Sequence, residues 1–146
     1  MKFSEFHEGQ VIETGSYQVG EEEVLDFARR YDPQWFHVDV ERSARESRFG
    51  GLIASGWQTC GIAMKLIVEA VLEGSESFAS PGLQYVKWLN PLRPGDTLTV
   101  RATVLEKRRS ESRASLGILR WQWAVVNQHG ATVLDLEATS LFDLAA

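Results

Sequence analysis

The sequence predicts an α+β protein in which one long apolar helix lies against an antiparallel sheet. Two patterns carry this prediction: apolar residues at helical spacing over 55–73, and alternation of apolar and polar residues from about residue 83 onward. No helical pattern separates the alternating segments, and strands joined by short turns pair antiparallel. The 146 residues, 44% of them hydrophobic, suit one domain spanning 1–146, with apolar surface to spare for a subunit interface.

The first part of the chain predicts a strand, a short helix and a long excursion. Residues 10–19 are rich in β-branched side chains, which is typical of an opening strand. Residues 21–31 have helical spacing with three glutamates in the first turn, and Pro33 ends this helix because the residue before a proline is pushed out of the α region. Residues 32–53 contain a possible short helix at 40–47, and irregular excursions of this length are usually functional or disordered. Their aromatic side chains argue against disorder.

The segment 55–73 is the strongest helix prediction. Its apolar side chains cover nearly the whole circumference, and only Lys65, Glu69 and Glu73 form a narrow polar stripe. A helix that is apolar on most sides is enclosed by other elements. We therefore expect a central helix that ends at Gly74.

Three later segments alternate in the manner of half-buried strands, with turn residues between them. The apolar positions expected to face the core are Leu98, Val100, Ala102 and Val104, then Leu119, Trp121, Trp123 and Val125, then Leu134, Leu136 and Ala138. Most of the five tryptophans are expected in the core for this reason, with Trp35 and Trp57 as the exceptions.

Composition and charge exclude several kinds of protein. A net charge of −5 makes the chain a poor general binder of nucleic acid, and no apolar run is long enough to span a membrane. The N-terminus lacks the apolar core of a signal peptide, and the single cysteine, Cys60, forms neither an internal disulfide nor a structural zinc site by itself. We expect a cytoplasmic protein without a metal.

Asp32 and His37 are the candidates for acid–base chemistry. They lie five residues apart in the excursion, and a carboxylate beside an imidazole can hold a water molecule and exchange protons near neutral pH. The spacing alone leaves a structural alternative, in which Asp32 caps a helix and His37 packs against its neighbours. The other two histidines lie in polar surroundings and are expected to be inert.

A glycine-containing segment, 49–57, leads into the long helix. Bare amides at a helix N-terminus can hold a phosphate, or polarise a carbonyl oxygen that becomes negative in the transition state. The alternative is an ordinary helix start capped by Ser55, with glycines that allow close packing. The segment matches neither a P-loop, nor a dinucleotide-binding fingerprint, nor a nucleophile elbow.

Three segments in this order resemble the MaoC-like dehydratases, relatives of the (R)-specific enoyl-CoA hydratases. They are Asp32–His37, Phe49–Trp57 and Trp88–Leu98, and the similarity extends over roughly residues 10–145. The resemblance implies a hot-dog fold, in which an antiparallel sheet wraps a long central helix. It also implies a homodimer, with a trimer of dimers compatible.

The resemblance also implies roles for individual residues. Asp32 and His37 would activate the water that adds, syn and reversibly, to a trans-2-enoyl thioester to give the (R)-3-hydroxyacyl thioester. The Gly56 amide would hold the thioester oxygen. Further substrate contacts would come from Ser55, Trp57, Gln34 and Trp35. No cofactor would be needed, since coenzyme A or phosphopantetheine enters only as part of the acyl-CoA or acyl carrier protein substrate.

The chain departs from the hydratase pattern at several of these positions. Gln34 and Trp35 stand where the hydratases have Asn-Pro, so Trp35 is expected to add bulk beside the site. Ser55 stands where the well-studied hydratases have histidine, and Met64 where some have serine. These changes bear on the substrate more than on the mechanism.

The segment 87–120 carries eight basic side chains against three acidic ones. Lys87 directly precedes the third family segment and Arg93 lies within it, so both are expected to contact the phosphates of the carrier. The alternative is that this charge forms an ordinary solvated face.

Two other functions stay open, because hot-dog folds also host thioesterases and non-catalytic acyl-thioester binders or partner subunits. A thioesterase commonly places a carboxylate on the central helix. Here that helix offers only Glu69 and Glu73, far from its N-terminus.

Overall fold

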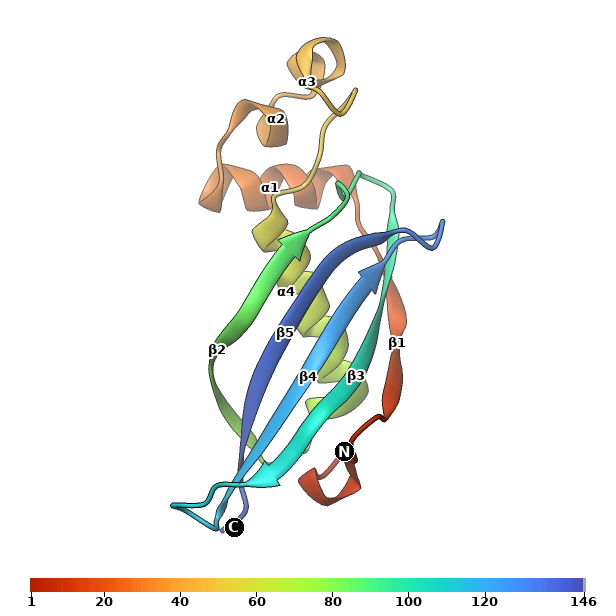
Figure 1. The fold of residues 1–146 in the computed structure, drawn as a ribbon. Helices are drawn as coiled ribbons and strands as arrows, with labels where there is room; N and C mark the ends of the chain where they lie inside the picture. The colour runs from red at the N-terminus through yellow and green to blue at the C-terminus, as the bar shows by residue number, and fades with distance from the viewer. Residues whose placement is uncertain (146) are drawn as a thin grey trace.

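A five-stranded antiparallel sheet forms the framework of the computed structural model, which describes residues 1–145. The sheet curves around the helix α4, Gly56–Ile67 (Figure 1). Its strands lie in the order β1-β3-β4-β5-β2. Their bounds are β1 Val11–Gln18, β2 Ser77–Trp88, β3 Thr97–Arg109, β4 Leu116–Val126 and β5 Thr132–Asp143. The predicted antiparallel sheet around one long helix is confirmed.

The strands β3, β4 and β5 bury the side chains that the alternation predicted. Every one of the eleven apolar positions named above is at most 5% exposed. They pack against Ile62, Ala63, Leu66 and Ile67 on the inner side of α4. The N-terminal segment adds Phe3 and Phe6 to this core, which the sequence pattern did not indicate because Phe3 belongs to a single short turn, η1 (Phe3–Glu5).

The strand β2 begins at Ser77, earlier than the alternation indicated. Its pairing with β5 shifts register three times between Ser77 and Tyr85, and the strand includes Pro81 and Gly82. Such irregularities change which face a side chain occupies, so a period of two cannot be recognised there. As the last strand of the sheet, β2 leaves one edge without a partner strand among residues 1–145.

The long helix begins and ends where predicted, but it is covered on one side only. Ser55 Oγ accepts a hydrogen bond from the Trp57 amide at the start, and α4 continues into a π-helical turn, η2 (Val68–Leu72), before Gly74 turns the chain with φ +75°. On the side away from the sheet, Trp57 is 60% and Met64 41% exposed. The sequence predicted a helix enclosed by other elements, and within residues 1–145 the sheet covers one side of it.

Three further helices lie beyond one end of the sheet, near the N-terminus of α4 (Figure 1). They are α1 (Glu21–Tyr31), α2 (Trp35–Val38) and α3 (Val40–Glu46), so the predicted helices at 21–31 and 40–47 are confirmed. With four residues, α2 is too short to show a helical period. None of the helices within residues 1–145 is long and apolar enough to cross a membrane.

Candidate active site

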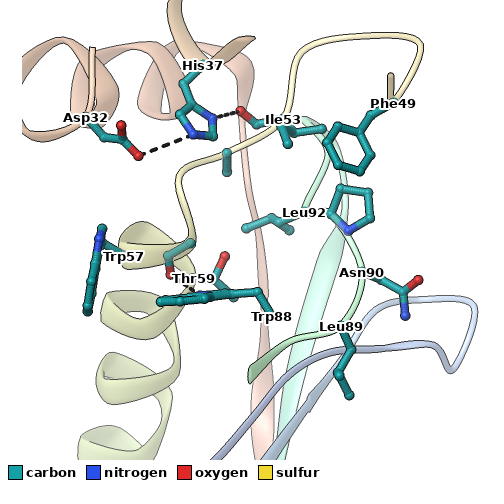
Figure 2. Close-up of a pocket in the computed structure, with 13 residues that line it drawn as sticks. Asp32, His37, Phe49, Ile53, Trp57, Thr59, Trp88, Leu89, Asn90 and Leu92 are labelled. Carbon is teal, nitrogen blue, oxygen red and sulfur yellow. Dashed lines mark hydrogen bonds and ion pairs between the residues drawn. The ribbon is translucent and has the colours of Figure 1, made fainter. Parts of the chain in front are cut away.

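A cavity of about 340 Å³ opens where the excursion after α1 passes the N-terminus of α4 (Figure 2). Three parts of the chain line it: the end of α1 with α2, the first turns of α4 with the residues before it, and the segment Trp88–Leu92. These are the three segments on which the family resemblance rests. The fold therefore brings together residues that are more than fifty positions apart.

Asp32 and His37 face each other at this cavity. The Nε2 atom of His37 lies 3.2 Å from Oδ2 of Asp32, and the Nδ1 atom lies 2.7 Å from the carbonyl oxygen of Ile53. Because a carbonyl oxygen can only accept, that contact assigns a proton to Nδ1 and leaves Nε2 directed at the carboxylate. The His37 side chain is 6% exposed and that of Asp32 17%. The predicted pair is thus in contact, nearly buried, and open to the cavity.

The neighbours of Asp32 favour its ionised form. Burial alone would raise the pKa of this carboxyl, but hydrogen bonds from Gln34 and Ser55 and the charge of His37 outweigh it, so the pKa is lowered. The Gln34 Nε2 atom donates to Oδ1 of Asp32 at 2.8 Å. Gln34, predicted as a substrate contact, therefore orients the Asp32 carboxylate, and it is not among the residues that line the cavity.

The start of α4 supplies a free backbone donor. Gly56 is the first residue of the helix and lines the cavity, and none of residues 1–145 accepts a hydrogen bond from its amide. The positive end of the helix dipole adds to the attraction for a negatively charged oxygen at this point. Ser55, which is fully buried, caps the helix by accepting from the Trp57 amide, and it contributes to the lowered pKa of the Asp32 carboxyl.

Position 56 requires glycine because the side chain of Trp88 lies too close to its backbone for any Cβ atom. A Cβ atom there would lie 2.4 Å from Nε1 of Trp88, whose indole crosses the first turn of α4. The same Nε1 atom donates a hydrogen bond to the carbonyl oxygen of Gly56 at 2.9 Å. Trp88 was expected in the core, yet it is 45% exposed at the cavity. The alternation pattern could not show this, because Trp88 is the last residue of its strand.

Of the two other tryptophans singled out in the sequence, one lines the cavity and the other does not. Trp57 lines the cavity, as predicted. Trp35 is turned toward α3, where the guanidinium of Arg42 lies 4.2 Å from its ring centroid, and it packs edge-on against Phe36. The structure therefore does not place the bulk of Trp35 at the cavity.

The two basic residues predicted to bind phosphate, Lys87 and Arg93, lie in different parts of the structure. Arg93 follows the cavity-lining Leu92 but does not line the cavity itself, and its Nη1 atom lies 3.9 Å from where a Cβ atom of Gly51 would be. Lys87 points to the opposite face of β2 from Trp88, since side chains alternate along a strand. Its ammonium lies 5.0 Å from the ring centroid of Tyr85. The structure does not bring Lys87 to the cavity.

A thioesterase-like carboxylate on the helix is also distant from the cavity. Glu69 pairs with Lys65 at 2.6 Å on the exposed side, and neither Glu69 nor Glu73 lines the cavity. In the part of the chain that is described, no three His, Cys, Asp or Glu side chains are grouped as metal ligands.

The antiparallel sheet, the helix that it surrounds and the order of its strands define a hot-dog fold. Within that fold, the chain belongs to the MaoC-like domain family, whose model matches residues 3–120. The chain is 36% identical over 141 residues to protein YdeM of Bacillus subtilis, covering 97% of this chain and 98% of that one.

Solved structures agree with this assignment. The MaoC-like dehydratase from Rhodospirillum rubrum is 36% identical, with a TM-score of 0.88 over 96% of this chain and 94% of that one. The R-hydratase PhaJ1 from Pseudomonas aeruginosa is 26% identical, with a TM-score of 0.74 over 97% of this chain and 84% of that one. The chain thus has a MaoC-like dehydratase fold related to the (R)-hydratases.

Proposed function

We propose that the protein is a hydratase that adds water reversibly to a trans-2-enoyl thioester and forms the (R)-3-hydroxyacyl thioester. The observation that carries the proposal is the contact between Asp32 and His37 at a cavity that also exposes the Gly56 amide. An acid–base pair and a backbone donor at one cavity are what this addition needs. Membership of the MaoC-like family and the likeness to an R-hydratase support it.

The geometry suggests how the two side chains divide the work. Water bound between Asp32 and His37 loses a proton to the carboxylate as its oxygen bonds to the β carbon. In the reactive state His37 carries a proton on each ring nitrogen, and its Nε2 atom delivers one to the α carbon as the electrons of the double bond move there. The proton then returns from Asp32 to His37 across their 3.2 Å contact. Both groups lie on one side of the substrate, so the addition is syn.

The Gly56 amide has the electrostatic role. As the nucleophile adds, negative charge develops on the thioester oxygen, and a preorganised donor at a helix N-terminus stabilises that charge more than it stabilises the ground state. The thioester itself acidifies the α carbon, so the residues present suffice for the proton transfers. Arg93, next in the chain to the cavity-lining Leu92, would contact a phosphate of coenzyme A or of the phosphopantetheine arm.

The proposal includes a homodimer. Large apolar side chains are exposed on the open side of α4 and along β2, and β2 offers an unpaired edge. Contiguous apolar surface of this kind marks an interface. These residues are Trp57, Met64, Val68, Phe78, Leu83 and Trp88. Light scattering should give roughly twice the 16.4 kDa mass of one chain at micromolar concentration, and a monomer mass would contradict this part of the proposal.

The experiment that tests the activity compares two outcomes on one substrate. Incubation with an enoyl-CoA should remove the ultraviolet absorbance of the conjugated thioester without releasing free thiol, and chiral analysis should find the (R)-3-hydroxyacyl product. Thiol release without hydration would instead identify a thioesterase. Binding without either reaction would identify an acyl-thioester-binding protein.

A further inference from the structure

Thr59 is a polar residue of the catalytic cavity that the mechanism above does not use. It lies one turn into α4 and lines the cavity on the side opposite Asp32 and His37 (Figure 2). The residue is only 3% exposed. Burying a hydroxyl group costs free energy that a hydrogen-bond partner normally offsets. A buried threonine at a cavity wall therefore calls for a partner, either in the protein or in the cavity.

Within the described chain, no residue forms a hydrogen bond with the Thr59 hydroxyl. A threonine in a helix can donate to the carbonyl oxygen four residues earlier, but here Ser55 O accepts from backbone amides of the first turn instead. The neighbouring polar side chains are also engaged elsewhere. Ser55 Oγ accepts from the Trp57 amide, and the indole of Trp88 donates to Gly56 O. The hydroxyl of Thr59 is thus available to a ligand.

The oxygen of Thr59 opens to the cavity. Two side-chain atoms in the described chain lack both a partner and exposed surface, and they are Gln58 Oε1 and Trp123 Nε1. Thr59 Oγ1 is not one of them, so it keeps some exposed surface, and the cavity that the residue lines provides it. Helical side chains lean toward the helix N-terminus, and residues three apart share a face, so this hydroxyl lies over the turn that begins at Gly56. The Gly56 amide and the Thr59 hydroxyl therefore face the same part of the cavity.

We propose that the Thr59 hydroxyl is a catalytic hydrogen-bond donor that holds the thioester oxygen together with the Gly56 amide. The inference rests on the proposed function, because it takes the occupant of the cavity to be an acyl thioester. A carbonyl oxygen has two lone pairs, so it accepts from the amide and from the hydroxyl at once. As water adds, negative charge develops on this oxygen, and both donors bind it more strongly than in the ground state. The hydroxyl keeps its own proton throughout.

Replacing the hydroxyl tests the proposal in the reaction. Thr59→Val puts a methyl group in place of the hydroxyl and should lower kcat for a short enoyl-CoA about 100-fold, the usual loss for one donor of this kind. Thr59→Ala, which adds no methyl group, should show a similar loss, and Thr59→Ser should keep most of the turnover. Thr139→Val is the matched control, since Thr139 is also nearly buried, at 7% exposed, but does not line the cavity. Wild-type kcat in the folded Val or Ala variant would overturn the proposal.

A pair of unreactive ligands separates this inference from the proposed reaction. Butyryl-CoA has the thioester oxygen but no double bond to hydrate, and its thioether analogue S-butyl-CoA lacks that oxygen. In calorimetric titrations, Thr59→Val should weaken the binding of butyryl-CoA about three- to tenfold, as expected for one neutral hydrogen bond, and leave that of S-butyl-CoA unchanged. Equal weakening of both ligands would show that the hydroxyl contacts another part of the substrate, and the proposal would be wrong. The expected binding pattern without turnover of any enoyl-CoA would overturn the hydratase proposal alone.

Discussion

Polar side chains are hydrated on the outer face of the sheet, but they are buried at the end of the molecule where α4 begins. On the sheet, Arg120 lies between Glu106 and Glu137, at 2.6 and 3.2 Å, and this network is open to water. At the helix end, His37 and Ser55 are buried, and Asp32 is nearly so. Burying polar groups has a cost that only specific partners offset. The comparison teaches that the charge pairs on the sheet stay hydrated, whereas the buried groups at the helix end are fixed by specific partners, as the proposed acid–base role requires.

Removal of either member of the buried pair should give the largest effect. Asp32→Asn and His37→Gln should each lower hydration turnover by about 10²–10⁴-fold, the usual contribution of a positioned proton-transfer group. Because both replacements nearly keep the shape of the side chain, the circular dichroism spectrum should be unchanged. Steady-state kinetics with a short enoyl-CoA measures the effect. Near-normal turnover in both variants would place the acid–base chemistry elsewhere.

Adding a methyl group at Gly56 tests the close contact between the start of α4 and the Trp88 indole. In Gly56→Ala the new Cβ meets the Trp88 indole, so the ring must move and its hydrogen bond to Gly56 O is lost. We expect the free energy of unfolding in urea to fall by about 1 kcal/mol and kcat/KM to fall about tenfold. Gly15→Ala, on β1, is the control, because its Cβ would meet nothing within 4 Å. Equal behaviour of the two variants would show that the Trp88 contact has no role.

Substitution of Arg93 and of Lys87 compares the loop beside the cavity with the outer face of the sheet. Arg93→Ala should raise the KM for a coenzyme A substrate several-fold with little change in kcat, because a remote phosphate contact binds ground and transition states alike. Lys87→Ala, on the outer face, should leave KM unchanged. The effect of Arg93→Ala should shrink as salt is added, since an exposed contact is screened. An equal rise in both variants would mean that the carrier crosses the sheet face.

The smallest effect concerns stability in acid. The pKa of Asp32 is lowered by its hydrogen bonds and by His37, so the folded state favours the carboxylate. Its stabilising contribution is complete above the ordinary aspartate pKa of about 3.9 and is lost as the pH falls through the lowered value. The difference in urea unfolding free energy between wild type and Asp32→Asn should therefore shrink from about pH 5 to about pH 3. A difference that grew on acidification would mean that the pKa is raised.

Local patterns determined most of the fold. The alternation in β3, β4 and β5 and the helical spacing of 21–31 and 55–73 predicted these elements correctly, because each pattern records which side chains face the core. The family segments likewise identified Asp32 and His37 and the start of α4. Their contact at 3.2 Å, however, depends on how the excursion folds back, and the hydrogen bond from His37 to Ile53 O spans sixteen residues.

The sequence by itself thus determined most of the elements and the family, and it singled out Asp32 and His37 as candidates for acid–base chemistry, since these depend on neighbours along the chain. Only the tertiary structure decided that Trp88 leaves the core and crosses Gly56, that Trp35 turns away to Arg42, and that Lys87 and Arg93 lie on different faces. It also decided that one side of α4 is open. Each of these depends on which distant segment occupies the space beside a residue, and no local periodicity records that.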